Sequence, residues 1–438
     1  MSIFNEKIVN SKTNLSYILW LIWYKFATKL TTNLNKLKII NDPVYGFISI
    51  PYEIIFDLIE HPYFQRLRRI QQLGFTNLVY PGALHTRFHH ALGAMHLMTQ
   101  AIETLKSKGV EITDEEAIGV TIAILLHDIG HGPFSHALER TIIQNIDHEE
   151  LSLWYMEALN KQFDGQLTTA IAIFKGNYPK QFLHQLVSSQ LDMDRLDYLT
   201  RDSFFTGVYE GVVGYDRIIK MLNVHHDKLV VDAKGIYSVE KFLIARRLMY
   251  WQVYLHKTVL VAELMLIKVL ERAIELANQN KSVWATDALN FFLQNRKNLN
   301  TQYKPIDILE KFTQLDDHDI YAAIKQWQFN DDSILRELCS RLIDRNLFKT
   351  KLQNEAFNDV KVDALNQKIQ QQFQVDKAEV HYLLYNSTTK NKAYDIKTDN
   401  INILYKNGTI KDVAMASDQL NLARLSDVVV KHYLCWAE

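Results

Sequence analysis

The stretch TIAILLHDIGHGPFSH, residues Thr121–His136, places a cluster of polar side chains directly after an apolar run. The apolar residues predict a buried helix, and Gly130, Gly132 and Pro133 predict that it ends close to His127. A buried charge costs free energy unless it is paired or bound to a metal ion. We therefore expect the three histidines and one aspartate of this stretch to have a chemical role at the end of a buried helix.

Helical patterns dominate the chain around this stretch. After the turn residues and short β-like run of NDPVYGFISIP, residues 41–51, apolar residues recur at helical spacing to about residue 275. Thr113 and Glu116 form a capping-box pattern, which predicts the start of the helix that carries Thr121–His136.

The last third of the chain has a different pattern. Helical spacing continues to about residue 372, and EVHYLLYN (379–386) and INILYKNGTIKDV (401–413) then predict strands. The second of these predicts a hairpin around Asn407 and Gly408, and we expect a final helix from about Ser417. The predicted fold class is mainly α, an all-helical core with a smaller α+β C-terminal region.

Length and composition limit the class of protein. With 438 residues the chain is too long for one ordinary core, and we expect a basic aromatic extension at 1–40, a helical domain at 41–275 and a C-terminal region at 276–438. The formal net charge of −1 argues against a general polyanion binder. Cys339 and Cys435 alone predict no disulfide framework and favour a reducing cytoplasm.

The N-terminal segment is basic and aromatic. Residues 1–40 contain six Lys and one Glu, a net charge of +5, and the run YILWLIWY at Tyr17–Tyr24. This run is shorter than the roughly 18 apolar residues that span a bilayer, so we expect no stable membrane span. The segment favours a peripheral helix or a mobile extension over a helix lying on a membrane surface.

Histidines are concentrated around the opening stretch. Of sixteen histidines, eight lie between residues 85 and 148. A lone histidine on an apolar helix is more often a core residue than a ligand, but a cluster with an embedded aspartate favours a metal site. Imidazoles and carboxylates suit Mn, Fe, Zn and Ni, and a bound cation neutralises a buried carboxylate. The cluster therefore predicts a divalent metal centre.

The residues alone leave the further ligands of this centre open. HTRFHHALG offers His89 and His90 at a helix start. The carboxylates offered by SSQLDMDRLDYLTRD are Asp192, Asp194, Asp197 and Asp202. Helical spacing predicts one shared face for Asp194, Tyr198, Arg201 and Asp202.

Taken in order, these motifs resemble those of a known family. R-x-x-H ending at His90, then H-D followed by GHGPFSH, then D-x-x-D-Y ending at Tyr198, is the pattern of HD-domain phosphohydrolases. The long form HDIGHGPFSH resembles the deoxynucleoside triphosphate triphosphohydrolase branch, which includes dGTPase-like proteins. The resemblance covers roughly residues 41–275. It implies an all-helical HD-domain core that hydrolyses deoxynucleoside triphosphates to deoxynucleoside and inorganic triphosphate.

The resemblance also implies roles for individual residues. The implied metal ligands are His90, His127, Asp128 and Asp194. The implied catalytic histidines are His131, His136 and His148. The implied substrate contacts are Gln72, Leu73, Arg87, Arg195, Tyr198, Asp202, Arg246 and Tyr254. Helical spacing places Arg246, Tyr250, Tyr254 and Lys257 on one face. The chain departs from the family pattern at Arg195, which is commonly Lys, and at His89, which is often Glu.

The family mechanism requires a divalent cation, here Mn, Fe, Zn, Ni or Mg, that activates water for attack on the α-phosphate. A triphosphate brings about four negative charges, which Arg87, Arg195 and Arg246 would offset together with the metal. We expect His136 to handle the proton of the leaving oxygen or to align the water. His131 and His148 would bind the phosphates.

The resemblance further implies partners, and it leaves alternatives. A deoxynucleoside triphosphate is the implied substrate, and the family tends to form homo-oligomers. Arg66 and Arg68 fall where regulated members bind an activating nucleotide, and they fit a plain amphipathic helix equally well. The alternative functions are another HD-type phosphohydrolase, either a nucleotidase or a phosphodiesterase, and a non-catalytic deoxynucleotide sensor.

Overall fold

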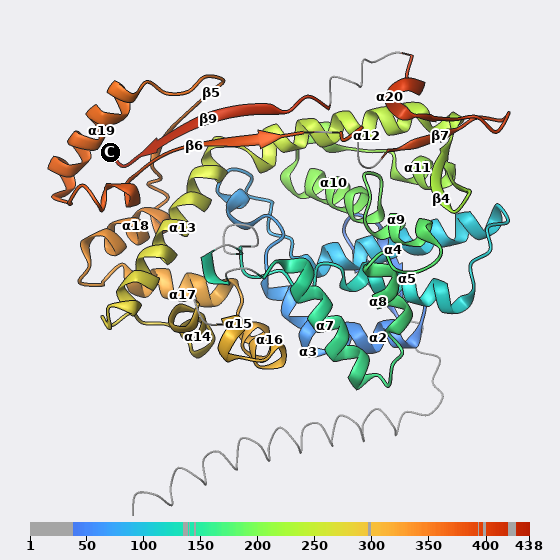
Figure 1. The fold of residues 1–438 in the computed structure, drawn as a ribbon, viewed down its shortest axis with the longest axis horizontal. Helices are drawn as coiled ribbons and strands as arrows, with labels where there is room; N and C mark the ends of the chain where they lie inside the picture. Colours follow the sequence, from blue (N-terminus) through green and yellow to red (C-terminus); the bar gives the residue numbers. More distant parts are fainter. Residues whose placement is uncertain are drawn as a thin grey trace, which may run out of the picture.

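The computed structural model describes residues 38–134, 139, 141–143, 146–296, 299–392, 394–396, 400–418 and 426–438. These residues form a predominantly helical fold with small sheets, some of them built from C-terminal strands (Figure 1). The predicted fold class is confirmed. The division into domains at residues 40 and 275 stays a prediction, and the N-terminal extension falls almost entirely outside the described residues.

Most of the helices precede residue 279. They are α2 (Glu53–Glu60), α3 (Pro62–Gln65), α4 (Arg87–Ser107), α5 (Asp114–Leu126), α7 (His148–Gln162), α8 (Thr168–Phe174), α9 (Gln181–Val187), α10 (Met193–Thr206), α11 (Tyr215–Met221), α12 (Ile236–Met249) and α13 (Lys257–Asn278). Short 3-10 turns lie between them at η1 (Arg66–Arg69), η2 (Gly74–Leu78), η3 (Tyr209–Gly211) and η4 (Ala233–Gly235), and a π turn lies at η5 (Tyr250–Tyr254).

The rest of the chain adds smaller helices, most of them on the α13 side of the molecule, whereas α20 lies beside α12 (Figure 1). They are α14 (Asp287–Asn295), α15 (Leu299–Gln302), α16 (Pro305–Gln314), α17 (Asp317–Trp327), α18 (Ser333–Ile343), α19 (Asp359–Phe373), η6 (Val380–Tyr382) and α20 (Val413–Ala416). Among the described residues, no helix combines the length and the apolar character needed to cross a membrane.

The strands form three sheets within the described ranges. One is the hairpin of β1 (Ile39–Asp42) and β2 (Gly46–Ser49). The second has the order β3 (Leu222–His225), β4 (Lys228–Asp232), β7 (Asn402–Leu404) and β8 (Ile410–Asp412). The third has the order β5 (Lys349–Gln353), β9 (Val429–Trp436) and β6 (Leu384–Asn391). Because β4 pairs in parallel with β7, the C-terminal region continues a sheet that begins in the helical part.

Helix α5 is the rigid support of the polar cluster. Its capping box is formed as predicted, since Thr113 Oγ1 accepts from the Glu116 amide and Glu116 Oε2 accepts from the Thr113 amide. From Val120 to Leu126 every side chain of the helix is buried, and the helix packs against α4 and α8. A helix that is apolar all round belongs in a core, so its last residue, Leu126, fixes where the polar residues begin.

The structure corrects two local predictions and confirms a third. The final helix expected from Ser417 is wrong for 429–436, which form β9, the central strand of its sheet; residues 419–425 lie outside the described ranges. The predicted strand at 379–386 begins with the turn η6, and β6 starts at Leu384. The hairpin around Asn407 and Gly408 is present, joining β7 and β8. Val, Tyr and Trp in β9 favour a strand once partners are available on both sides.

Candidate metal centre and substrate pocket

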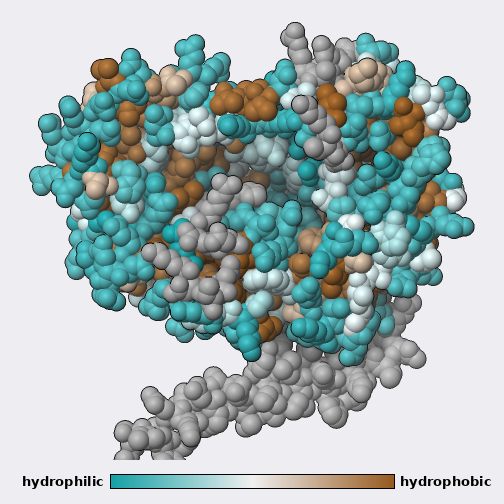
Figure 2. Space-filling model, viewed as in Figure 1, coloured by the Kyte–Doolittle hydropathy of each residue, from teal (hydrophilic) through white to brown (hydrophobic). Residues whose placement is uncertain are grey.

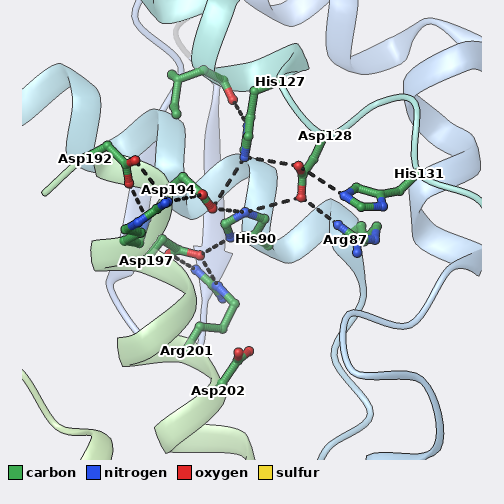
Figure 3. A network of polar contacts seen from close by, with 12 residues as sticks. Arg87, His90, His127, Asp128, His131, Asp192, Asp194, Asp197, Arg201 and Asp202 are labelled. Atoms are coloured by element: carbon green, nitrogen blue, oxygen red, sulfur yellow. Dashed lines mark hydrogen bonds and ion pairs between the residues drawn. The ribbon is translucent and has the colours of Figure 1, made fainter. Parts of the chain in front are cut away.

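Three helix ends converge on one point in the protein (Figure 3). His127 is the C-cap residue of α5, and Asp128 follows it directly. His90 lies in the first turn of α4, and Asp194 lies in the first turn of α10. Figure 3 shows these four side chains pointing toward one another. The helix ends therefore bring two imidazoles and two carboxylates together from distant parts of the sequence.

The distances within this group suit a single cation. Oδ1 of Asp194 lies 3.1 Å from His90 Nε2 and 3.4 Å from His127 Nε2. Asp128 lies 3.4 Å from His127 Nε2 and 3.7 Å from His90 Nε2. Both Nε2 atoms are buried and have no hydrogen-bond partner among the described residues. Buried polar atoms without partners are rare, and lone pairs aimed at one point are what a metal ion requires.

The other nitrogen of each ring is held in place. Nδ1 of His127 lies 2.7 Å from the Ile124 carbonyl, and Nδ1 of His90 lies 2.7 Å from Oδ2 of Asp197. A metal-binding histidine usually donates its second N–H to such an acceptor, which fixes the tautomer and the ring orientation. This arrangement leaves Nε2 of both rings available for a cation.

Asp197 belongs to a buried charge network behind the centre. The guanidinium of Arg201 donates to Asp197 from Nε and Nη2, both at 3.0 Å, and to Asp42 from Nη1 at 2.7 Å. Arg201 and Asp197 have fully buried side chains, and that of Asp42 is nearly so. The network compensates the charge of Asp197 and holds it against the His90 ring.

Contacts between oppositely charged groups in the centre stabilise the charged forms of Asp194 and His90. Burial opposes ionisation of Asp194, but its close contacts with the His127 and His90 rings hold the pKa of that carboxyl well below its usual value. Burial also opposes charge on His90, but its close contact with Asp194 and its hydrogen bond to Asp197 raise the pKa of that ring to about 10. A cation must displace protons from such rings, so metal binding and proton release are coupled here.

A second group of candidate ligands lies beside the first. Nε2 of His131 lies 3.4 Å from Asp128 Oδ1, and the His131 ring stacks on the ring of His148 with centroids 4.0 Å apart. Nδ1 of His148 lies 2.7 Å from Glu139 Oε1. Arg87 donates to Asp128 Oδ2 at 2.5 Å. His131, His148 and Arg87 therefore flank Asp128, whereas His136 lies outside the described residues.

Two adjoining cavities open next to these residues. The larger, about 840 Å³, is lined by His127, Asp128, His131, His148 and Asp194, and it extends to Lys175 and His184. The second, about 430 Å³, has aromatic and aliphatic walls, and it is also lined by the charged residues Arg87, Arg195, Asp202 and Glu263. The residues that line both are Gln72, Arg87, Arg195 and Tyr198. Figure 2 shows a hollow near the middle of this face of the molecule, with hydrophilic residues along much of its rim.

The structure places seven of the eight predicted substrate contacts along these cavities. Leu73, Asp202 and Tyr254 line the second cavity, in addition to the four shared residues. Arg246 lines neither, but Nε and Nη1 of its guanidinium are buried without a hydrogen-bond partner among the described residues. Its guanidinium lies 6.0 Å from the ring centroid of Tyr250, which lines the second cavity.

Both carboxylate oxygens of Asp202 are occupied. Tyr254 donates its hydroxyl to Oδ2 at 2.7 Å, and Nε2 of His85 lies 2.8 Å from Oδ1. His85 is buried and stacks on Phe205 with ring centroids 4.4 Å apart. The Asp202 carboxylate is therefore oriented from two sides at the wall of the second cavity.

His89 and Asp192 do not face the metal centre, because each of them caps the start of a helix. The Thr86 amide donates to His89 Nδ1 at 3.1 Å, so His89 caps α4 where the family often has Glu. Asp192 is the N-cap of α10 and accepts from the amides of Ser189 and Arg195. Side chains that accept from the free amides of a first turn stabilise a helix start, which leaves His90 and Asp194 to face the centre.

Two predicted placements are wrong. Arg201 points into the core toward Asp42, so it does not share the face of Asp194, Tyr198 and Asp202 that lines the cavities. Lys257 is exposed and starts α13, because the π turn η5 interrupts the regular helical spacing expected after Arg246. This is the kind of local irregularity that helical periodicity alone misses.

Arg66 and Arg68, whose role was left open, lie in different surroundings. Its side chain is fully buried and donates to the carbonyls of Leu315, Ile129 and His131. Arg68 is exposed, with its guanidinium 3.6 Å from the ring centroid of Phe88. Arg66 therefore supports the backbone that follows the H-D pair.

Asp317, which is 3% exposed at the start of α17, was not predicted from the sequence. Its carboxylate accepts from the Gln71 amide at 2.8 Å and from the Phe134 amide at 3.1 Å. Gln71 directly precedes Gln72, which lines both cavities, and Phe134 lines the second cavity with a positive φ of 50°. The paired aspartates Asp316 and Asp317 predict a helix cap, because such residues are common at helix starts. This pattern does not predict a contact with Phe134.

Comparison with known proteins assigns the family. The HD domain family matches residues 87–202, and the HD associated region matches residues 213–308. The chain is 31% identical over 398 residues to the uncharacterized protein YwfO of Bacillus subtilis, with 88% of each chain covered. It is 34% identical over 239 residues to the deoxynucleoside triphosphate triphosphohydrolase SAMHD1 homolog of Dictyostelium discoideum, covering 50% of this chain and 46% of that protein.

A solved structure gives the same assignment. A phosphohydrolase from Bacteroides thetaiotaomicron is similar over 92% of this chain and 100% of its own, with a TM-score of 0.88 and 53% sequence identity. The polar centre of this chain, with its histidines and aspartates at three helix ends, lies within the matched HD domain. The chain therefore belongs to the HD-domain phosphohydrolase family.

Proposed function

We propose that this protein hydrolyses deoxynucleoside triphosphates to deoxynucleoside and inorganic triphosphate. The observation that carries the proposal is that the His/Asp centre lines a polar cavity, which shares Arg87, Arg195 and Tyr198 with a second cavity that has aromatic and aliphatic walls. A nucleotide has the same division into a charged triphosphate and an aromatic base. Similarity to the Dictyostelium triphosphohydrolase homolog supports this substrate class.

His90, His127, Asp128 and Asp194 would hold the divalent cation. The two buried Nε2 atoms without partners and the two carboxylates within 3.7 Å of them fit such an ion. When bound in a site of this type, the cation lowers the pKa of water and polarises a phosphoryl oxygen. Asp197 and the Ile124 carbonyl keep the two rings in the orientation that this binding needs.

Positively charged residues would hold the triphosphate. Arg87 and Arg195 line both cavities, and Arg246 carries buried N–H groups that have no partner in the part of the chain that the structure describes. Preorganised cations that face the phosphates stabilise the charge that develops during phosphoryl transfer, without reorganisation. His131 and His148 would bind phosphate oxygens from the polar cavity, and His136 would handle the proton of the leaving oxygen.

The second cavity would hold the deoxynucleoside. Asp202, oriented by His85 and Tyr254, would accept a hydrogen bond from the 3′-hydroxyl. Tyr198 would crowd a 2′-hydroxyl, which favours deoxyribose over ribose. Gln72 and Leu73 would contact the sugar and the base, and the Gln72 Oε1 atom is buried without a partner among the described residues.

The test is to incubate the purified protein with each dNTP and rNTP, alone and in mixtures, with Mg²⁺ or Mn²⁺, and to measure triphosphate release. We expect triphosphate from deoxynucleotides and little from ribonucleotides. Monophosphate or orthophosphate as the first product would instead indicate a nucleotidase or a phosphodiesterase. Tight binding of a deoxynucleotide with no turnover in either metal would indicate a sensor. Faster turnover in mixtures would show activation by a second nucleotide.

A further inference from the structure

One acidic side chain lies in the apolar cavity away from the metal centre. Glu263, on α13, lines the second cavity with Leu73, Phe134, Tyr254 and Leu255. A Cβ on Gly74 would lie 3.8 Å from Glu263 Oε1 and 3.7 Å from Phe134 Cδ1, so both side chains approach Gly74, which also lines this cavity.

Glu263 has no protein partner among the described residues. It makes no hydrogen bond or ion pair with them, in contrast to Asp202 in the same cavity, which has two partners. Burial raises the pKa of Glu263 to about 7, and no neighbouring cation offsets that effect. A half-buried carboxyl without a donor is unfavourable for folding, and such a group in a cavity is a candidate for ligand recognition.

The surroundings of Glu263 define the ligand that would satisfy it. The cavity presents aromatic and aliphatic walls, which suit a flat heterocycle. Of its two carboxylates, Asp202 is already bound by His85 and Tyr254, whereas that of Glu263 can accept two parallel hydrogen bonds from a ligand. Among the nucleobases, guanine carries two adjacent N–H donors, N1–H and the 2-amino group, on one edge. Adenine and cytosine place an acceptor beside their amino group, and a carboxylate repels that acceptor.

We propose that Glu263 is a specificity-determining residue that accepts hydrogen bonds from N1–H and the 2-amino group of guanine, so that dGTP is the preferred substrate. This inference rests on the proposed function, since it assigns the base end of the same pocket. It adds a residue of α13, beyond the H-D motifs, to substrate selection.

The first test uses the unaltered protein. Deoxyinosine triphosphate differs from dGTP in lacking the 2-amino group, so it retains one of the two hydrogen bonds. We expect kcat/KM for dGTP to exceed that for dITP by about tenfold, the usual effect of one hydrogen bond to a charged group. Equal values for dGTP and dITP would overturn the inference without any question of misfolding.

The second test is Glu263→Gln. Glutamine keeps one oxygen acceptor but replaces the other with an NH2 donor. This NH2 group would face one N–H of guanine unfavourably, whereas the amide as a whole would pair with the amino group and the adjacent ring nitrogen of adenine. We expect the ratio of kcat/KM for dGTP to that for dATP to fall by at least about fivefold. A smaller change in this ratio, or an equal loss for all four dNTPs, would overturn the assignment.

Glu271→Gln is the matched control. Glu271 lies on the same helix two turns later, outside the cavity, where it pairs with Lys268. We expect its nucleotide preference to equal that of the unaltered protein. If no dNTP is hydrolysed by any form, the proposed function fails, and the relative binding of dGTP and dITP measured by calorimetry still tests Glu263 separately.

Discussion

Nδ1 of His90 lies 2.7 Å from Oδ2 of Asp197, and neither side chain is exposed to solvent. Asp197 is in turn held by Arg201, which also pairs with Asp42. The His90 ring thus connects the candidate metal centre to a buried charge network in the core. The orientation of Nε2 of this ring depends on residues that would never touch the metal or the substrate.

Asp197→Asn tests this dependence. The amide is a weaker acceptor than the carboxylate, so the His90 ring loses both orientation and basicity. We expect the metal dissociation constant to rise about 10- to 100-fold, measured by competition with a chelator. Asp363→Asn, at an exposed position of α19, is the control and should leave metal affinity unchanged. An unchanged dissociation constant in folded Asp197→Asn protein would contradict the role of this pair.

Asp202→Asn tests how the sugar is bound. The variant weakens the proposed contact with the 3′-hydroxyl, so kcat/KM for a dNTP should fall by about tenfold or more. For the matching 2′,3′-dideoxynucleoside triphosphate, which has no 3′-hydroxyl, we expect little change. Tyr254→Phe, which removes one of the two groups that orient Asp202, should have a smaller effect in the same direction. Equal losses for both substrates would show that Asp202 acts through stability alone.

Asp317→Asn tests the contribution of the C-terminal region to the site. The carboxylate accepts from the amides of Gln71 and Phe134, and an asparagine side chain can accept from one of them well. We expect kcat/KM to fall by about tenfold, because Gln72 and the backbone after the H-D pair lose a shared support. Steady-state kinetics beside the Asp363→Asn control measure this effect, and full activity would rule it out.

The same residue predicts a pH dependence of stability. Burial raises the pKa of Asp317 to about 6, above its ordinary value of 3.8. The folded state therefore binds the proton more tightly than the unfolded state, and the resulting stabilisation is lost as the pH rises through about 6. Between about pH 5 and pH 7.5 the unaltered protein should lose about 1 kcal/mol relative to Asp317→Asn. Urea unfolding of both proteins measures the difference, and parallel pH profiles would refute it.

The local features of the fold and the site could be predicted from the sequence because their signals are local. The apolar run of α5, its capping box and the glycines after Asp128 place the H-D pair at a helix end, as the structure has it. The choice of Asp194 over Asp192 came from the family motif. An N-cap argument could also have made that choice, since Asp192 precedes the first turn of α10 and caps it.

Contacts between distant segments could not be predicted. Asp317 and Phe134 are 183 residues apart, and Arg66 and Leu315 are 249 apart. No periodicity or spacing relates such pairs, because they meet through the packing of α16 and α17 against the helical core. The prediction of a helix in place of β9 was wrong for the same reason, because the pairing of this strand with β5 and β6 decides its conformation.

The most direct test of the central claim is the fate of the attacking water. Hydrolysis of dGTP in water labelled with heavy oxygen should give deoxyguanosine and inorganic triphosphate in equal amounts, with the label in the triphosphate. This result requires attack on the α-phosphorus and release of the nucleoside 5′-oxygen. Label in pyrophosphate or orthophosphate, accompanied by dGMP or dGDP, would contradict the proposed reaction.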